Sequence, residues 1–270
     1  MKRYLVESAA IRQNLETLKK RAGKARLFAV VKGNGYGLGL VPLAAICRDA
    51  GVDTFCVTEV SDAKQLRGAG FTQQILMIRP TCDVDEVHQL LDLDVVLTVS
   101  SQDDAAVLNG IATQRKQKVK AHIEIDTGMG RYGFLPGEMD KLLHIYSYMD
   151  GLDLCGIYTH FHSAFCNKKA TDLQMVCFRS VIRQLQEKGF DVGICHCCNS
   201  AGTLLHPAYH LDATACNTMV TALSALNAKR QLTEEPGEDY GFTDESLTVT
   251  VTAAGETNTF TFGAENAATG

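Results

Sequence analysis

The sequence predicts an α/β protein, specifically a (β/α)8-type (TIM-like) barrel that lacks its eighth strand and is followed by a helix and a β-hairpin. Short apolar runs rich in β-branched residues alternate with helical patterns, which is typical of repeated strand-helix units in a parallel sheet. Polar residues follow the strand ends, and the alternation stops after about residue 210. These three observations favour a barrel with its site at the carboxyl ends of the strands.

Seven strands are expected from the apolar runs. They are Leu27–Val31, Thr54–Thr58, Gln74–Ile78, Val95–Val99, Ala121–Ile125, Leu154–Thr159 and Gly193–Cys198. Between them, Ile11, Leu15 and Leu18 lie on one helical face. A helix is expected from Thr171 to Lys188, with Thr171 and Gln174 spaced as a capping box.

Chemically versatile residues lie just after several of these strands. Lys32 follows the first, Asp126 and Arg131 the fifth, His160 the sixth, and Asn199 and Ser200 the seventh. Such residues converge only if the sheet closes, which favours a barrel over an open sheet. No GxGxxG opens a helix after the first strand, so a dinucleotide-binding fold has little support.

The pattern after residue 210 predicts a different module. One amphipathic helix is expected from Asp212 to Lys229, and the strictly alternating segments Leu247–Thr252 and Thr259–Phe262 predict an antiparallel hairpin. An eighth parallel strand is not recognisable. We therefore divide the chain into an incomplete barrel, residues 1–210, and a helix plus hairpin, residues 211–270.

The composition argues against several classes of function. The net charge of −5 and the absence of a Lys/Arg patch argue against nucleic-acid binding. No apolar run is long enough for a membrane span, and a cytoplasmic protein with small-molecule chemistry is expected. The ten cysteines are interpreted as reduced thiols, and no metal site is expected even at Cys195-His196-Cys197-Cys198.

Lys32 ends the apolar run Ala29-Val30-Val31 and begins the glycine-rich segment Gly33-Asn34-Gly35-Tyr36-Gly37. A lysine that loses part of its hydration there deprotonates more easily and can attack the carbonyl of an aldehyde cofactor. The alternative is a surface lysine that follows a buried strand.

Four motifs in order resemble alanine racemase, specifically its barrel domain. They are Ala29–Gly37, Ile125–Phe134, Gly156–Phe161 and the segment from His196 through Asn199-Ser200-Ala201. The resemblance covers roughly residues 1–212 and implies pyridoxal 5′-phosphate (PLP) as cofactor and alanine as substrate. Residues 211–270 resemble, weakly, a domain of unknown function from bacterial membrane-associated proteins.

The resemblance implies roles for Lys32 and for two further polar residues. Lys32 would bond covalently to the cofactor and move the α-proton of the substrate. Tyr36 would reach the phosphate, although a tyrosine packed on the barrel rim is the alternative. Arg131 would hold the substrate carboxylate; the alternative is a simple ion pair with Asp126.

The resemblance also implies cofactor contacts from the last two strand ends. His160 would lie under the cofactor ring, and Ser200 and Asn199 would help to bind the phosphate. Structural roles are the alternatives: a hydrogen-bonded core histidine for His160 and helix caps for the other two.

The resemblance implies PLP-dependent racemisation of L- and D-alanine, with a homodimer in the intact family. The segment after Ala213 reads Thr214-Ala215-Cys216-Asn217 where the family has an arginine-bearing eighth strand, and the family's second catalytic tyrosine has no counterpart. We therefore expect a truncated, poorly active copy. A non-catalytic PLP-binding barrel and a hybrid chain without enzymatic function are the alternatives.

Overall fold

The computed structural model describes residues 4–211, 216–218, 228–230, 247–253 and 256–262. The chain forms two compact units, one of Val6–Asn227 and one of Met1–Leu5 with Ala228–Gly270. In the described part of the chain no helix is long and apolar enough to cross a membrane.

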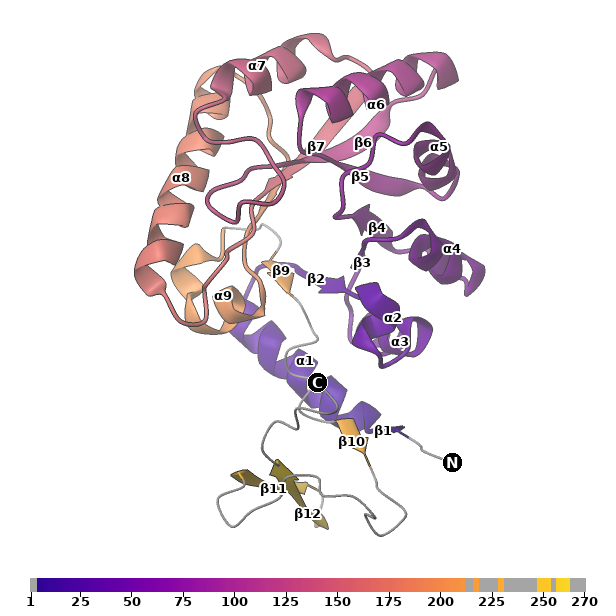
Figure 1. Cartoon of the computed structure of the whole chain (residues 1–270), viewed down its shortest axis with the longest axis vertical. Coiled ribbons are helices and arrows are strands. Elements are labelled where there is room, and N and C mark those ends of the chain that lie inside the picture. Colours follow the sequence, from indigo (N-terminus) through magenta and orange to yellow (C-terminus); the bar gives the residue numbers. More distant parts are fainter. Residues whose placement is uncertain (1–3, 212–215, 219–227, 231–246, 254–255, 263–270) are drawn as a thin grey trace, which may run out of the picture. The chain divides into compact units, whose positions relative to one another are not determined.

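The larger unit is built around one curled sheet (Figure 1). Its strand order is β8-β7-β6-β5-β4-β3-β2-β9, and the described pairings between neighbours are all parallel. The strands are β2 (Leu27–Val30), β3 (Thr54–Val57), β4 (Gln74–Met77), β5 (Val95–Val99), β6 (Val119–Glu124), β7 (Leu152–Tyr158), β8 (Ile194–His196) and β9 (Cys216–Thr218). The first seven confirm the seven strands expected from the sequence.

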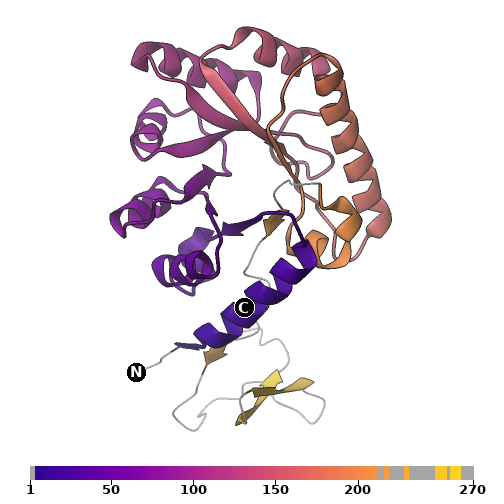
Figure 2. The same ribbon diagram turned by 180° about the vertical axis from the view of Figure 1, so that it is seen from behind.

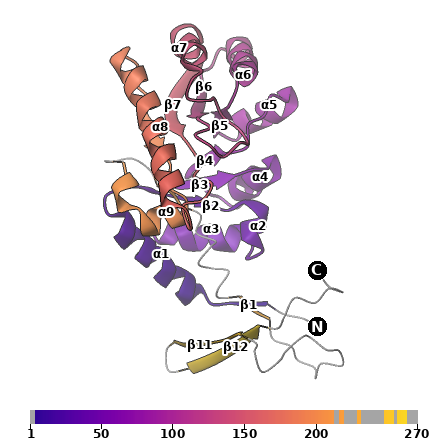
Figure 3. The ribbon, with the colours of Figure 1, turned by 60° about the vertical axis from the view of Figure 1, so that its left-hand side comes forward.

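Helices lie outside this curled sheet, as the views from the front and from behind show (Figures 1 and 2). Seen from the side, the strands lie between α8 and the pair α4 and α5 (Figure 3). The helical segments are α1 (Ser8–Ala22), α2 (Lys32–Tyr36), α3 (Leu40–Asp49), α4 (Val60–Gly68), α5 (Val84–Asp92), α6 (Gln102–Arg115), α7 (Met139–Tyr148), α8 (Lys168–Glu187), α9 (Ser200–Leu205) and the 3₁₀ turn η1 (Pro207–Tyr209).

The strands are buried on both faces, which explains their continuous apolar sequences. In β2, Leu27 and Ala29 belong to the large core between sheet and helices, whereas Phe28 and Val30 belong to a smaller inner cluster with Cys56, Leu76 and Val96. The inner cluster is fully buried. The Phe28 ring of β2 lies 5.1 Å from the His196 ring of β8, so the two strands approach each other across the barrel interior.

Two expectations from the sequence are corrected here. We expected no eighth strand, but the three-residue strand β9 pairs in parallel with β2. We also expected one helix from Asp212 to Lys229, but β9 lies within this range and the strand β10 (Ala228–Arg230) begins at its end. The remainder of that predicted helix and the connector Thr233–Tyr240 lie outside the described residues.

The helix predicted over Thr171–Lys188 is confirmed, but it begins one turn earlier. Its N-cap is Asn167, whose side chain accepts a hydrogen bond from the Ala170 amide. Thr171 and Gln174 therefore lie inside α8 and do not form a capping box. Gln174 is instead free to make contacts with the loops at the carboxyl ends of the strands.

The smaller unit contains the predicted hairpin. Strands β11 (Leu247–Ala253) and β12 (Glu256–Phe262) pair antiparallel, with Leu247 opposite Phe262. A second two-stranded pairing joins β1 (Tyr4–Val6) to β10.

Candidate functional site

Lys32 lies at the carboxyl end of β2, directly after the buried residues Val30 and Val31. The backbone then turns with left-handed dihedral angles from Gly33 to Tyr36, with φ values of 60°, 54°, 62° and 54°. The Asn34 side chain accepts a hydrogen bond from the Leu40 amide, which closes this turn onto α3. The left-handed turn therefore ends the strand at Lys32 and holds the lysine at the barrel mouth.

Glycine is favoured at Gly33 and Gly35 for two reasons, although Asn34 and Tyr36 adopt the same left-handed conformation. A left-handed conformation is unfavourable for residues that carry a Cβ atom. At Gly35 an added Cβ would also lie 3.3 Å from both the Leu40 amide nitrogen and the Leu43 Cδ2 atom. The glycines thus allow the close packing of α2 against α3.

The Lys32 amine is partly buried. Burial lowers the pKa of Lys32, and the positive charge of Arg131 lowers it further. Both effects disfavour the ammonium form. Lys32 therefore reaches its neutral, nucleophilic form at a lower pH than a surface lysine does.

Arg131 belongs to the loop between β6 and α7. The Asp126 carboxylate accepts hydrogen bonds from the Gly128 and Gly130 amides at 2.9 and 3.0 Å, and a bridge between Ile125 and Phe134 closes the loop. Asp126 thus orders the loop backbone. Among the described residues no ion pair joins it to Arg131, and the exposed guanidinium lies 5.6 Å from the Tyr132 ring centroid.

His160 follows β7, and its pKa reflects the same two cations. Burial lowers the pKa of His160 to about 4, with further contributions from Arg131 and Lys32. These electrostatic effects show that Lys32, Arg131 and His160 lie near one another at one end of the barrel. We call these three residues the mouth cluster.

Gln174 links the loops that carry the mouth cluster. Its buried amide donates hydrogen bonds to the His160 carbonyl and to Thr127 Oγ1, both at 3.1 Å, and accepts one from the His162 amide. This role could not be predicted from the sequence, because a glutamine in a helix is usually a solvent-exposed residue.

Asn199 is the N-cap of α9. Its Oδ1 atom accepts a hydrogen bond from the Gly202 amide at 2.9 Å, and its Nδ2 atom donates to the Phe161 carbonyl at 3.0 Å. The side-chain amide therefore orients the start of α9, which supports the cap alternative for this residue. Ser200 next to it is buried. Tyr36 is 37% exposed at the other end of the site.

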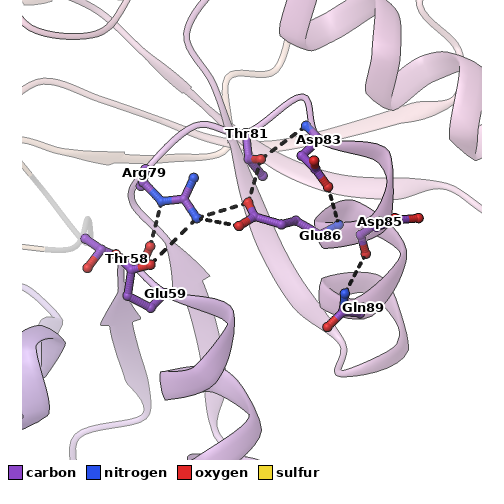
Figure 4. Close-up of polar contacts among 8 residues, drawn as sticks. All are labelled: Thr58, Glu59, Arg79, Thr81, Asp83, Asp85, Glu86 and Gln89. Atoms are coloured by element: carbon purple, nitrogen blue, oxygen red, sulfur yellow. Dashed lines mark hydrogen bonds and ion pairs between the residues drawn. The ribbon is translucent and has the colours of Figure 1, made fainter.

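A second arginine near the mouth differs from Arg131. The Arg79 guanidinium contacts both Glu86 carboxylate oxygens at 3.0 and 3.1 Å and donates to the Thr58 carbonyl (Figure 4). Thr81 also donates to Glu86, at 2.7 Å. With its charge already paired, Arg79 is less suited than Arg131 to hold an added carboxylate. Arg79 and Glu86 line a cavity of about 480 Å³ that Tyr132 also borders.

Sequence reasoning missed a group of polar residues inside the barrel. The buried side chains of Thr98, His122, Glu124, Tyr158 and His196 face one another across β5 to β8. We call them the interior network. A usable signal was present in β6: His122 and Glu124 alternate with apolar residues, which places both on the same face of the strand.

Burial keeps the two interior histidines neutral. His122 Nδ1 and His196 Nε2 are 2.9 Å apart, and His196 stacks on Tyr158 at 4.7 Å. Burial lowers the pKa of His122 to about 4 and that of His196 well below its ordinary value. His196 thus belongs to the interior, and the described residues contain no cluster of three or more His, Cys, Asp or Glu side chains suited to a metal ion.

The mouth cluster fits a cofactor that carries an aldehyde and an anionic group. Lys32 provides an amine that loses its proton more readily than an ordinary lysine does, and Arg131 provides a cation without a carboxylate partner among the described residues. The larger cavity of about 730 Å³, against α8 and β8, includes none of the predicted site residues. The predicted site residues therefore lie apart from this cavity.

A curled sheet of parallel strands, with the predicted site residues after its strand ends, defines a TIM-like barrel protein. Residues 6–221 match the family described as alanine racemase, N-terminal domain. The chain belongs to this family, which is PLP-dependent.

Similar proteins agree with this assignment. Alanine racemase of Desulforamulus reducens is 39% identical over 207 residues, covering 75% of this chain and 55% of that relative, and alanine racemase of Methanococcus maripaludis is 34% identical over 210 residues, covering 77% and 56%. Among solved structures, alanine racemase from Clostridium difficile 630 is 26% identical with a TM-score of 0.76, covering 82% of this chain and 58% of that one. The chain thus spans about half the length of the curated relatives it matches.

Proposed function

We propose that this chain supplies the PLP-binding barrel of an alanine racemase, which interconverts L-alanine and D-alanine. The observation that carries the proposal is the mouth cluster: a partly buried lysine amine beside an arginine that has no carboxylate partner among the described residues. The family match over residues 6–221 supports the same function.

The residues that would hold PLP come from three strand ends. Lys32 would form the covalent bond through Nζ, His160 would pack under the ring, and Tyr36 and Ser200 would contact the phosphate. When bound, PLP withdraws electrons from the amino acid and makes its α-proton more acidic. Asn199 would contribute indirectly, because its amide is already bonded to Gly202 and Phe161 and holds Ser200 in place.

Each residue of the mouth cluster has a separate task in this proposal. Arg131 holds the substrate carboxylate, since a guanidinium can donate two parallel hydrogen bonds. Lys32 Nζ, as a free amine, would move the α-proton on one face of the substrate, and its lowered pKa helps it to lose its own proton first. Inversion also requires a proton donor on the opposite face, which Lys32 does not supply. His160 is uncharged at neutral pH, so it adds no third positive charge beside Lys32 and Arg131.

The proposal extends to the cellular role. D-alanine made by this reaction would serve as a peptidoglycan precursor, and the reaction would take place in the cytoplasm of a bacterium. A homodimer is the proposed assembly, because the family resemblance implies a shared site.

Cofactor absorbance tests the proposal most directly. Adding PLP to the full chain should produce a visible band from the bond to a lysine amine, and Lys32→Ala should abolish it. The exposed Lys64→Ala variant is a matched control and should keep the band. Retention of the band in Lys32→Ala would contradict the assignment of this lysine.

An assay for D-alanine then separates two functions. Formation of D-alanine from L-alanine supports the racemase. A lysine-dependent band without D-alanine would indicate a PLP-binding barrel that does not catalyse racemisation. The absence of any band would overturn both.

A further inference from the structure

A buried carboxyl group lies just below the mouth cluster. Glu124 is the last residue of β6, is only 3% exposed, and stands opposite Tyr158 of β7 in the parallel register. The Tyr158 hydroxyl and Glu124 Oε2 are 3.1 Å apart. Arg131 and Asp126, from the loop that follows β6, are the charged groups that act on Glu124.

The contact to Tyr158 is one part of a longer chain of oxygen atoms. Tyr158 Oη also lies 3.1 Å from Thr98 Oγ1, and Thr98 donates its hydroxyl hydrogen to the Met77 carbonyl at 2.8 Å. Thr98 and Tyr158 are both buried. Beyond Tyr158, the His196 ring stacks on its face and the Cys56 thiol is the other titratable neighbour.

The protonation state of Glu124 can be inferred by assigning the hydrogen atoms in this chain of oxygen atoms. It contains three oxygen-oxygen contacts, and each needs one hydrogen atom. Thr98 and Tyr158 supply one each. The third is present only if the Glu124 carboxyl group is protonated, so that Glu124 donates to Tyr158, Tyr158 to Thr98, and Thr98 to the Met77 carbonyl.

An ionised Glu124 leaves this chain one hydrogen short. Tyr158 would then donate to the carboxylate, and the Thr98 hydrogen would have to serve either Tyr158 or the Met77 carbonyl. A buried polar contact without a hydrogen is unfavourable. Burial also raises the pKa of Glu124 to about 7, against the opposing effects of Tyr158 and Arg131.

We propose that Glu124 holds a proton in this arrangement and acts as a positioning residue for Arg131, fixed by the chain through Tyr158 and Thr98 to the Met77 carbonyl. The proton keeps Glu124 neutral, so the Arg131 guanidinium retains its full charge for an incoming carboxylate. Loss of the proton creates a carboxylate that competes for the same guanidinium. The link to substrate binding rests on the proposed function, whereas the protonation of Glu124 does not.

Infrared difference spectroscopy on the full chain without cofactor tests the protonation. The carbonyl stretch of a protonated, buried carboxyl group should be present at low pH and disappear as the pH rises from about 5 to about 9. The Glu124→Gln variant should lack this band. Its amide can donate to Tyr158 as the protonated acid does, so circular dichroism should show a folded protein.

Three further variants identify the partners of Glu124 by the midpoint of the same titration. Thr98→Val removes the group that requires the third hydrogen and should lower the midpoint by roughly one pH unit. Tyr158→Phe and Arg131→Ala remove groups that favour the ionised form and should raise it. The absence of a band specific to Glu124, or a midpoint that Thr98→Val leaves unchanged, would overturn the proposal.

Binding of propionate, a simple carboxylate, then tests the positioning role. Wild-type affinity should fall several-fold as Glu124 ionises, and Glu124→Gln should remove this part of the pH dependence. An identical pH dependence in the two proteins would contradict the link to Arg131. This failure is distinguishable from failure of the racemase proposal, because the infrared and propionate measurements use neither PLP nor turnover.

Discussion

The mouth cluster and the interior network both contain histidine but differ in charge. Lys32 and Arg131 at the mouth are partly buried or exposed cations, whereas Glu124, His122 and His196 in the interior are buried and paired with neutral groups. Burial lowers the pKa of His160 and His196 alike, but only His160 has two cations beside it. Position relative to the strand ends therefore decides which residues can recognise an anion.

The largest expected effect is the difference in alanine binding between substitutions of two arginines near the mouth. Arg131→Ala should raise the alanine concentration that half-saturates the change in cofactor absorbance by about 10³-fold, because two charge-assisted hydrogen bonds are lost. Arg79→Ala is the control: it should leave alanine binding nearly unchanged and lower stability, since Glu86 loses its partner. Equal effects of the two substitutions on alanine binding would break the distinction.

Replacing His196 in the interior and replacing His160 at the mouth should lower protein stability by different amounts. His196→Ala should lower the free energy of unfolding by roughly 3 kcal/mol, because it leaves a cavity beside Tyr158 and removes the partner of His122. His160→Ala, at the partly exposed mouth, should cost less. Urea denaturation of both variants measures the difference, and a larger cost for His160 would reverse our assignment of structural and site roles.

The pH dependence of stability should report on the interior. The pKa of Glu124 in the folded state, about 7, exceeds its value in an unfolded chain. Its contribution is therefore fully present below the unfolded pKa and is lost as the pH rises through about 7. Relative to Glu124→Gln, the wild type should lose about 3 kcal/mol of stability between about pH 4.5 and pH 8. A parallel pH profile for the two proteins would show that Glu124 does not titrate in this range.

The smallest effects concern the left-handed turn that follows Lys32. Gly33→Ala should cost about 1 kcal/mol, because an added Cβ meets no atom within 4 Å and only the backbone conformation is unfavourable. Gly35→Ala should cost more, since its Cβ would press against Leu40 and Leu43. Thermal unfolding ranks the two variants, and a greater loss for Gly33→Ala would contradict the described packing.

The sequence was sufficient for most of the barrel. Buried parallel strands such as Thr54–Val57 are apolar at every position or nearly so, and this pattern is distinct from helical periodicity. The segment from Asp212 to Lys229 was wrongly predicted as one helix, because apolar residues at helical spacing do not reveal a short strand such as β9 that is fixed by its neighbour β2.

Candidate site residues could be predicted from the sequence only at positions that directly follow a strand. Lys32, Arg131 and His160 were predicted in this way and stay predictions as site residues; their charges are close enough to lower the pKa of Lys32 and of His160. Gln174 and Glu124 were not found, because their roles depend on partners distant in sequence: His160 and Thr127 for the first, Tyr158 for the second. No local pattern specifies such pairs.

The Arg131 guanidinium, which pairs with no carboxylate in the described part of the chain, has a practical consequence for handling the protein. Small inorganic anions such as phosphate and sulfate should collect beside it and beside Lys32, because the two cations are close enough for Arg131 to lower the pKa of Lys32. Purification buffers that contain these salts will compete with any negatively charged ligand, and higher ionic strength will weaken its attraction to the barrel. A zwitterionic buffer at low salt is therefore the better medium for titrations.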